Sequence, residues 1–296
     1  MSWSKMARKD FEDVIQSRLI WASVGLFVLL MVIIGIGVQS VDEPVFEDFI
    51  DLFAQLGGWL MLPLIAIMIG YMAIVGERQS GSLRVLFGLT FSRGEVLIGK
   101  LASRVSVMVV VTIISLVVGL VVATAVTGGI DVQLFLAFSG LTILLAAMFT
   151  SIAISASALT STRYRSMGLA VGAYILFALL WHPIAAGIHY VIEGSLPPYE
   201  APGWYFLLTR LNPLEAFNQV TSGLIDQYVW GLIGWVNVVE DIDVDFTDPD
   251  VLLLQDRITG DLPLYLTDGA AALILALWTI VPIGIAYWSF NRVDLN

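Results

Sequence analysis

Six long uncharged stretches dominate this sequence and determine the solvent in which it folds. Each runs for more than twenty residues without Asp, Glu, Lys or Arg: residues 19–41, 52–76, 105–130, 132–162, 166–192 and 269–291. A hydrocarbon core about 30 Å thick is crossed by about 20 helical residues. Because hydrocarbon offers the backbone no hydrogen-bond partners, each stretch must be a helix. The sequence therefore predicts an all-α, polytopic membrane protein with six transmembrane helices.

The 296 residues leave room for a single membrane domain beside these helices. We place the spans near residues 19–38, 56–76, 103–127, 134–160, 167–190 and 270–290. Before them, residues 3–17 carry apolar side chains at helical spacing, which predicts an amphipathic helix lying at the membrane interface. Two long loops remain, at 77–100 and 193–268.

The charges predict the orientation in the membrane. Twelve of the fourteen Lys and Arg residues fall on the side that holds both termini. Cytoplasmic loops retain Lys and Arg, so we expect both termini in the cytoplasm and a multi-pass protein of the cell membrane. On this orientation the cytoplasmic side carries +6 and the external side −17, which together give the net charge of −11.

So acidic an outer face suits very high salt, where screening weakens repulsion between carboxylates. Only three of the fourteen basic residues are Lys, and this bias resembles proteins of halophilic archaea. The chain has no cysteine, which excludes disulfides and thiol chemistry. Its first eighteen residues have no apolar core of the kind that a cleaved signal peptide needs.

The loop at 77–100 predicts a short helix that projects from the membrane. Gly81 and Ser82 break the preceding span, and Gly88 ends the short helix. Between these breaks lies an apolar stripe of Leu83, Leu86 and Phe87. A projecting helix with an apolar face is suited to docking against a partner. Ser92 and Glu95 then form a capping box that starts the next helix.

Residues 94–101 match a phosphate-binding loop at seven of eight positions. The eighth should be Ser or Thr, which would bind magnesium, and it is Leu101. Such a loop also needs a strand before it, whereas this segment follows a capping box. We therefore expect a helix here and no binding of ATP by this chain.

Small residues mark two packing seams. Ser151 and Ser155 lie four residues apart in the fourth stretch, and Gly168 and Gly172 in the fifth. Small side chains let helix backbones approach closely. Either seam could lie within one chain or between two chains.

Two clusters of polar residues offer weaker candidates. His182, His189 and Glu193 lie near one helix face and could bind zinc, although His residues in an aromatic belt are the better interpretation. The acidic residues of 241–250 alternate as in a calcium loop but have Phe246 and Leu252 where the turn and the bidentate ligand are needed. A solvated acidic face explains them better.

The middles of the spans hold almost no ionisable groups. Ion-driven carriers need such groups in the membrane, where they are costly and are kept for function. We therefore expect the energy for any transport to come from a partner at the cytoplasmic face.

Several of these segments together resemble the type-2 (ABC-2) ABC transporter permeases, and NosY-like permeases in particular. The resemblance lies in Glu77-Arg78, Gly81-Ser82-Leu83 and Leu86, then Ser92-Arg93 and Gly99-Lys100. Ala7-Arg8-Lys9-Asp10-Phe11, the small-residue fourth span and Leu211-Asn212-Pro213-Leu214 look like the same group. One departure is Thr90, where the family commonly has proline.

This resemblance implies a permease subunit, an exporter working as a homodimer or with a similar permease in lipid. A separate ABC ATPase subunit would bind ATP and magnesium, so that this chain holds no cofactor and is not an enzyme. The residues that the resemblance assigns to ATPase coupling are Glu77, Arg78, Gly81, Ser82, Leu83, Arg84, Leu86, Phe87, Ser92 and Arg93. Two other functions stay open: an intramembrane metal-dependent enzyme built on the His residues, or a non-transporting membrane scaffold.

Glu77 and Arg78 carry one further expectation. Adjacent helical residues point about 100° apart, so the side chains of Glu77 and Arg78 do not form their main ion pair with each other. We expect Arg78 to reach an acid such as Asp10, Glu12 or Asp13, and Glu77 a base such as Arg163 or Arg165. Such pairs would tie the loop to the first and fourth spans.

Overall fold

The computed structural model describes residues 3–82, 92–231, 252–258 and 261–292, and every regular element in these ranges is helical. Six helical segments are long and apolar enough to cross a membrane: Arg18–Val38, Phe46–Ser80, Arg93–Thr127, Val132–Leu159, Arg163–Glu193 and Asp268–Ser289. The predicted all-α, six-span fold is thereby confirmed.

Four spans are single helices, namely α2 (Arg18–Val38), α7 (Arg93–Thr127), α8 (Val132–Leu159) and α13 (Asp268–Arg292). The second span is divided into α3 (Phe46–Phe53), the π-helix η1 (Ala54–Met61), α4 (Leu62–Gly70) and α5 (Val75–Ser80). The fifth is divided into α9 (Arg163–Ile175), the π-helix η2 (Leu176–Leu180) and α10 (Trp181–Glu193). Each divided span has a proline just after its π-helix, Pro63 or Pro183, which cannot donate a backbone hydrogen bond.

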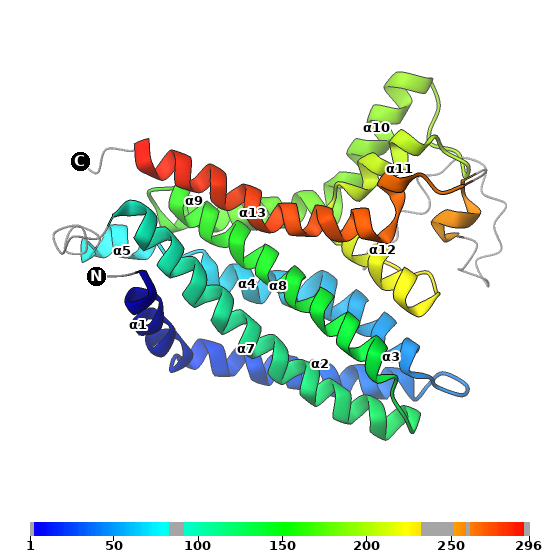
Figure 1. Cartoon of the computed structure of the whole chain (residues 1–296), viewed down its shortest axis with the longest axis horizontal. Helices are drawn as coiled ribbons and strands as arrows, with labels where there is room; N and C mark the ends of the chain where they lie inside the picture. The colour runs from blue at the N-terminus through cyan, green and yellow to red at the C-terminus, as the bar shows by residue number, and fades with distance from the viewer. Residues whose placement is uncertain (1–2, 83–91, 232–251, 259–260, 293–296) are drawn as a thin grey trace.

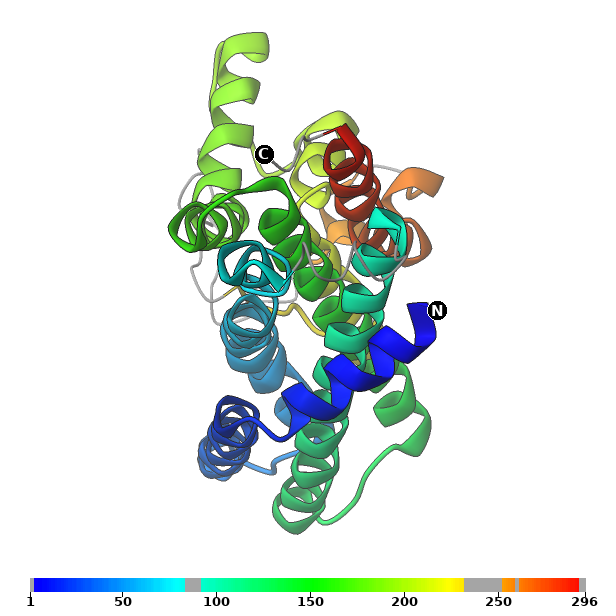
Figure 2. The ribbon, with the colours of Figure 1, turned by 90° about the vertical axis from the view of Figure 1, so that its left-hand side faces the viewer.

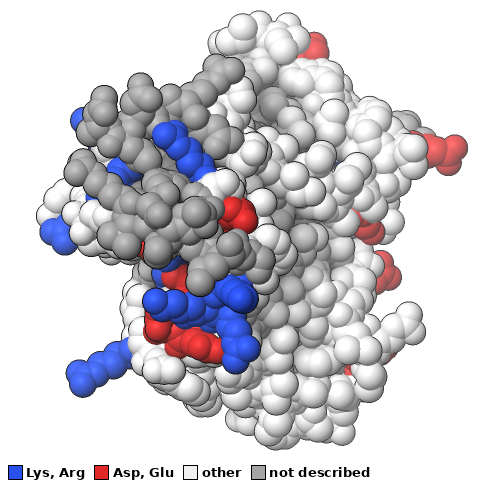
Figure 3. Space-filling model, turned by 60° about the vertical axis from the view of Figure 1, so that its left-hand side comes forward, with Lys and Arg blue, Asp and Glu red and all other residues white. Residues whose placement is uncertain are grey.

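The spans run along the long axis of the molecule, and the start of α1 (Trp3–Ile15) and the end of α13 lie at the same end (Figure 1). We call this end, which also holds α5 and the start of α7, the basic end. The opposite end, which holds α3 and the start of α8, is the acidic end. Figure 3 shows Lys and Arg side chains gathered with acids at the basic end and acids alone at the far margin.

Helix α8 lies at the centre of the bundle, packed against α4, α7 and α13. Its small residues explain this place, because they let neighbouring backbones come close. A Cβ atom added to Gly70 of α4 would lie 2.6 Å from the Cβ of Ala153 of α8. Ser151 and Ser155 are buried in the same part of α8, so this seam lies within the chain.

The amphipathic helix α1 crosses α7 at the basic end (Figure 2). Met6 on its apolar face is buried in a small core with Val96 and Leu97 of α7. The crossing is close at Gly99, where an added Cβ would lie 3.2 Å from the Met6 sulfur and 3.3 Å from the Trp3 carbonyl oxygen. Glycine at this position therefore allows α1 to rest on α7.

The long loop expected at 193–268 folds into helices where it is described: α11 (Gly203–Arg210), α12 (Pro213–Ile225) and the 3₁₀ turns η5 (Leu254–Asp256) and η6 (Leu264–Leu266). Their shared core contains Ala185, Ala201, Tyr205, Phe206, Leu254 and Leu266. Arg210 is buried beside it and donates from Nη1 to the Leu266 carbonyl at 2.8 Å. Burial lowers the pKa of Arg210 to about 10, opposed by the nearby Asp268 and Glu215 charges.

Candidate functional site

A cluster of charged side chains joins three elements at the basic end. Lys100 of α7 forms ion pairs with Asp10 of α1 and with Glu77 of α5. Ser103 donates from Oγ to Asp10 at 2.7 Å, and the Arg104 Nε atom lies 3.2 Å from the same carboxylate. We call these five residues the Lys100 cluster.

The cluster is largely shielded from solvent, and this burial makes the loss of any one ion-pair partner costly. The side chain of Lys100 is 6% exposed and that of Asp10 is 11% exposed. Burial alone would raise the pKa of Asp10, but the Arg104 and Lys100 charges and hydrogen bonds from Lys100 and Ser103 lower it below the ordinary value. Because a buried ion left without its partner costs about 3–5 kcal/mol, each member depends strongly on the others.

Local sequence explains how the cluster assembles. Lys100, Ser103 and Arg104 are spaced i, i+3 and i+4, so they share one face of α7. Gly99 lets α1 approach that face and brings Asp10 to it. Arg104 also reaches past the cluster, with Nη1 donating to the Ile69 carbonyl of α4 at 3.4 Å.

Helix α5 is positioned by the end of α8. Between α4 and α5 the backbone leaves helical geometry, and the N–H groups of Ile74 and Val75 donate to the hydroxyl oxygen of Ser157 at 3.0 and 2.9 Å. Arg78 adds a bond from Nη1 to the Thr160 carbonyl at 2.8 Å. Gly81 ends α5 with φ of 78°, a conformation that suits glycine.

Glu77 and Arg78 therefore reach different neighbours, as expected, but not the ones we named. Glu77 pairs with Lys100, whereas Arg163 donates to the hydroxyl of Tyr164. Asp10 of α1 is held by Lys100 and Arg104, whereas Arg78 bonds the end of α8. The named partners are wrong because Lys100, on the face of α7 that meets α1, lies between Glu77 and Asp10 and pairs with both.

That decoy segment is helical throughout, since residues 94–101 all lie in α7. The capping box that starts α7 is confirmed: Ser92 N–H donates to Glu95 at 2.9 Å, and Glu95 N–H donates to the Ser92 hydroxyl at 3.2 Å. Arg93 is the first residue of the helix. This segment is thus a helix and does not form the loop between a strand and a helix that a phosphate-binding motif requires.

The remaining predicted coupling residues divide into two groups. Gly81, Ser82, Ser92 and Arg93 flank the gap in the described chain on either side. The Ser82 hydroxyl donates to the Glu77 carbonyl at 3.3 Å, which ties this flank to α5. Leu83, Arg84, Leu86 and Phe87 lie outside the described residues, so their role stays a prediction.

The second small-residue seam is exposed. Gly168 and Gly172 of α9 face away from the bundle, and a Cβ added to either would meet no atom within 4 Å. This pair is therefore not a seam within the described part of the chain.

The two His residues at the acidic end serve different neighbours. His182 pairs through Nε2 with Glu215 of α12 at 2.9 Å. His189 stacks on Trp204, with ring centroids 5.5 Å apart, and its Nδ1 lies 3.0 Å from the Ser195 carbonyl oxygen. Within the described ranges no three His, Asp or Glu side chains are placed to hold a metal ion. The acidic run 241–250 lies outside those ranges.

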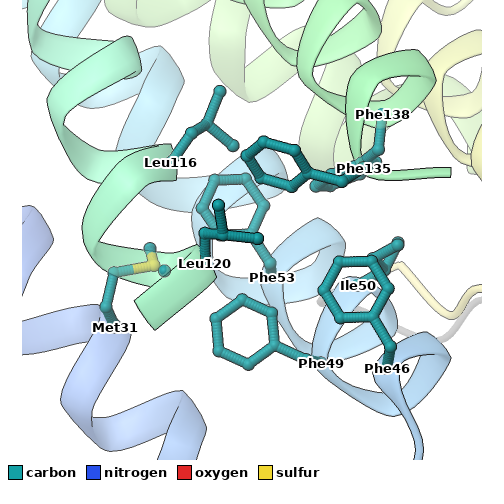
Figure 4. Close-up of a pocket in the computed structure, with 10 residues that line it drawn as sticks. Met31, Phe46, Phe49, Ile50, Phe53, Leu116, Leu120, Phe135 and Phe138 are labelled. Atoms are coloured by element: carbon teal, nitrogen blue, oxygen red, sulfur yellow. The ribbon is translucent and has the colours of Figure 1, made fainter. Parts of the chain in front are cut away.

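An apolar cavity lies among the spans toward the acidic end. Figure 4 shows aromatic rings of α3 and α8 closing on it beside residues of α2 and α7: Met31, Phe46, Phe49, Ile50, Phe53, Leu116, Leu120, Phe135 and Phe138. Gly119 also lines it. The cavity is small, and its apolar lining offers no group for acid–base or nucleophilic chemistry.

Sequence reasoning missed Lys100, Ser103, Arg104 and Ser157. The first three could have been found, because their i, i+3, i+4 spacing places a base beside Asp10 once α1 packs on α7. Nothing in the sequence separates Ser157 from the other small residues of α8. Its role depends on the backbone break after α4, which only the structure shows.

The comparisons with known proteins agree with this architecture. Residues 5–295 match the family described as ABC-2 family transporter protein. The chain is 26% identical over 294 residues to a probable ABC transporter permease protein NosY of Pseudomonas aeruginosa, covering 97% of each chain. It is 28% identical over 222 residues to the NosY protein of Stutzerimonas stutzeri, covering 73% of this chain and 79% of the relative. The chain belongs to the ABC-2 family, and it is a multi-pass membrane protein that forms the transmembrane permease subunit of an ABC transporter.

Proposed function

We propose that the basic end faces the cytoplasm and receives a separate ABC ATPase on the segment between α5 and α7. The family implies such a partner. The charge distribution supports the orientation, since Lys and Arg favour the cytoplasmic side. ATP and magnesium would bind to the partner, and this chain would hold no cofactor and catalyse no reaction of its own.

The Lys100 cluster carries the proposal. A push on the segment after α5 acts first on α5, which by itself is a helix of six residues. Glu77 links α5 to Lys100 of α7, and Lys100 links both to Asp10 of α1. Arg78 and Ser157 link α5 to α8. Movement of α5 therefore displaces three long or interfacial helices together, as transport across a bundle requires.

We further propose that two copies associate through α9 and that transport is export, as the resemblance implies. The exposed Gly168 and Gly172 face supports the contact, because small residues favour close helix packing. The chain has no cysteine, so Gly168→Cys gives a single thiol. Oxidation should then yield a cross-linked dimer, whereas Gly140→Cys, a glycine of α8 that also faces open space, should not. Equal cross-linking of both would contradict this contact.

The acidic external side supports a high-salt habitat. We propose that the −17 charge on that side is tolerated because salt screens it. Thermal stability in detergent should then rise as potassium chloride is raised from about 0.1 M to about 1 M, where the Debye length falls from about 10 Å to about 3 Å. A melting temperature that does not change with salt would contradict it.

The function as a whole is tested by reconstitution. The purified chain in lipid should hydrolyse no ATP, and co-expression with its ATPase should yield a stable complex that does. Magnesium-dependent ATP hydrolysis by this chain alone would overturn the division of roles. Failure to form a complex with any ABC ATPase encoded beside it would favour the scaffold.

A further inference from the structure

Helix α12 enters the bundle from the acidic end and lies against both divided spans. It packs with η1 and η2 and with α8 and α13, and Figure 1 shows it among the ends of these helices. Asn212 caps its first turn by accepting from Leu214 N–H at 3.0 Å. Most of its length is buried: Pro213, Leu214, Ala216, Phe217, Asn218, Thr221, Ser222 and Ile225.

The second span loses a helical hydrogen bond beside α12. In η1 the Leu62 N–H donates to the Gly57 carbonyl, five residues back instead of four. In a continuous α-helix the Trp59 carbonyl would accept from residue 63, but Pro63 has no N–H. The hydroxyl of Tyr174 donates to that carbonyl at 2.8 Å instead. Tyr174 belongs to α9, so the replacement donor comes from the other divided span.

The fifth span is altered in a similar way. η2 is followed by Pro183, and α10 then turns steeply away from the line of α9 (Figures 1 and 2). The Phe177 carbonyl inside η2 accepts from the Asn212 side chain at 2.8 Å. Asn212 is fully buried and is the capping residue of α12. The start of α12 is thus fastened to the π-helix of the fifth span.

Nearly two turns further on, α12 is fastened to the π-helix of the second span. The Trp59 indole N–H donates to the Asn218 side-chain oxygen at 2.9 Å, and both residues are buried. The ring of Phe217 lies against Gly58, where an added Cβ would be 2.6 Å from the ring. Phe217 also packs on Phe138, which lines the apolar cavity.

We propose that α12 is a latch on the acidic end, and that η1 and η2 are the points at which the second and fifth spans bend when the latch releases. π-Helical segments with nearby proline are places where helices kink and where backbone bonds can be exchanged at low cost. Tyr174, Asn212 and Asn218 hold both segments in one arrangement. Release of α12 would withdraw Phe217 from Phe138 and open the cavity toward the acidic end. The inference rests on the permease function proposed above.

The test measures two distances in the complex with the ATPase, with and without nucleotide trapped by vanadate after ATP hydrolysis. Spin labels at Val132→Cys and Gln227→Cys report on α12 relative to the start of α8. Labels at Lys9→Cys and Tyr164→Cys report on the basic end, where both side chains are exposed. The labelled chain is mixed with an excess of unlabelled chain, so that each distance comes from one copy.

We expect both distances to change on nucleotide trapping. A change at the basic end without a change between residues 132 and 227 would overturn the latch and leave the proposed function standing. No change at either end would overturn both.

One variant tests whether the hydrogen bond of Tyr174 helps to hold the latched arrangement. Tyr174→Phe removes only the hydroxyl that bonds the Trp59 carbonyl, and Tyr190→Phe is the matched control, because that residue is exposed on α10. Without nucleotide, Tyr174→Phe should raise the released population about five-fold, the effect of one hydrogen bond. Tyr190→Phe should leave it unchanged. Equal populations in wild type and Tyr174→Phe would contradict the latch.

Discussion

Lys100 is buried between two carboxylates, one from α1 and one from α5, and forms an ion pair with each. Asp10 is also held by Arg104 and Ser103, whereas Lys100 is the ion-pair partner that the structure gives Glu77. A buried charge contributes little net stability when paired, and its loss is costly because the partners stay buried. These ion pairs therefore fix the positions of α1, α5 and α7 relative to one another.

Protonation of Asp10 should weaken its ion pairs over a defined pH range. The folded pKa of Asp10 lies below its ordinary value of 3.8, so the folded protein binds fewer protons than the unfolded chain in acid. The stabilisation by Asp10 is therefore complete above the ordinary pKa and is lost as pH falls through the folded pKa. The melting temperature of Asp10→Asn should lie below that of wild type near pH 7 and approach it as pH falls below about 4. A gap that stays constant over this range would contradict the assignment.

Ser157 offers a second prediction at this scale. Its hydroxyl accepts from two backbone N–H groups, and Ser157→Ala leaves both without this acceptor, at about 1–3 kcal/mol for each. Ser155→Ala is the control, because the Ser155 hydroxyl only donates to the Ser151 carbonyl within α8. Thermal unfolding in detergent should show a clear loss of stability for Ser157→Ala alone. Similar losses for the two variants would contradict the role of Ser157.

At the scale of elements, the contact between α1 and α7 depends on the absence of a side chain at residue 99. Gly99→Val would drive atoms into the Met6 sulfur and the Trp3 carbonyl, which lie 3.2 and 3.3 Å from the first added carbon. We expect α1 to shift from α7 and stability to fall by about 1–3 kcal/mol. Gly140→Val, which faces open space on α8, is the control. Limited proteolysis between α1 and α2 should rise for Gly99→Val only, and equal cleavage would contradict the prediction.

The elements also show how far sequence reasoning extends. Uncharged length predicts all six spans, because the bilayer imposes it, and the Ser92 capping box predicts the start of α7. The divisions of the second and fifth spans do not follow from hydrophobicity, since π-helical and α-helical residues are equally apolar. Pro63 marks where a backbone donor is missing, but the donor that replaces it on the Trp59 carbonyl comes from a distant residue, Tyr174. The Phe177 carbonyl of η2 likewise accepts from the distant Asn212 side chain. Such long-range partners cannot be read from local pattern.

At the scale of the whole molecule, the two ends have different chemistry. The basic end gathers a buried ion cluster that joins α1, α5 and α7, and the acidic end closes the bundle with α11 and α12. Long helices join the two ends, so a displacement at one end can reach the other. This arrangement suits a permease subunit, in which movement at one end must be transmitted to the other.

The Glu77→Gln variant tests most directly whether the ion pair between α5 and Lys100 transmits movement from the ATPase. Glu77→Gln removes the charge that ties α5 to Lys100 and leaves the Lys100–Asp10 pair in place. Glu12→Gln is the matched control, because that acid is exposed in a surface pair with Arg8, and solvent screens such pairs strongly. Both variants should insert, bind the ATPase and support ATP turnover.

The decisive measurement is the reaction rate of a single thiol at Leu120→Cys, in the apolar cavity, with a reagent added from the acidic side. In wild type and Glu12→Gln the rate should differ several-fold between the nucleotide-free and vanadate-trapped complexes. In Glu77→Gln the two rates should be equal although ATP is still hydrolysed. A wild-type difference in Glu77→Gln would contradict the claim that the Lys100 cluster couples the ATPase to movement at the acidic end.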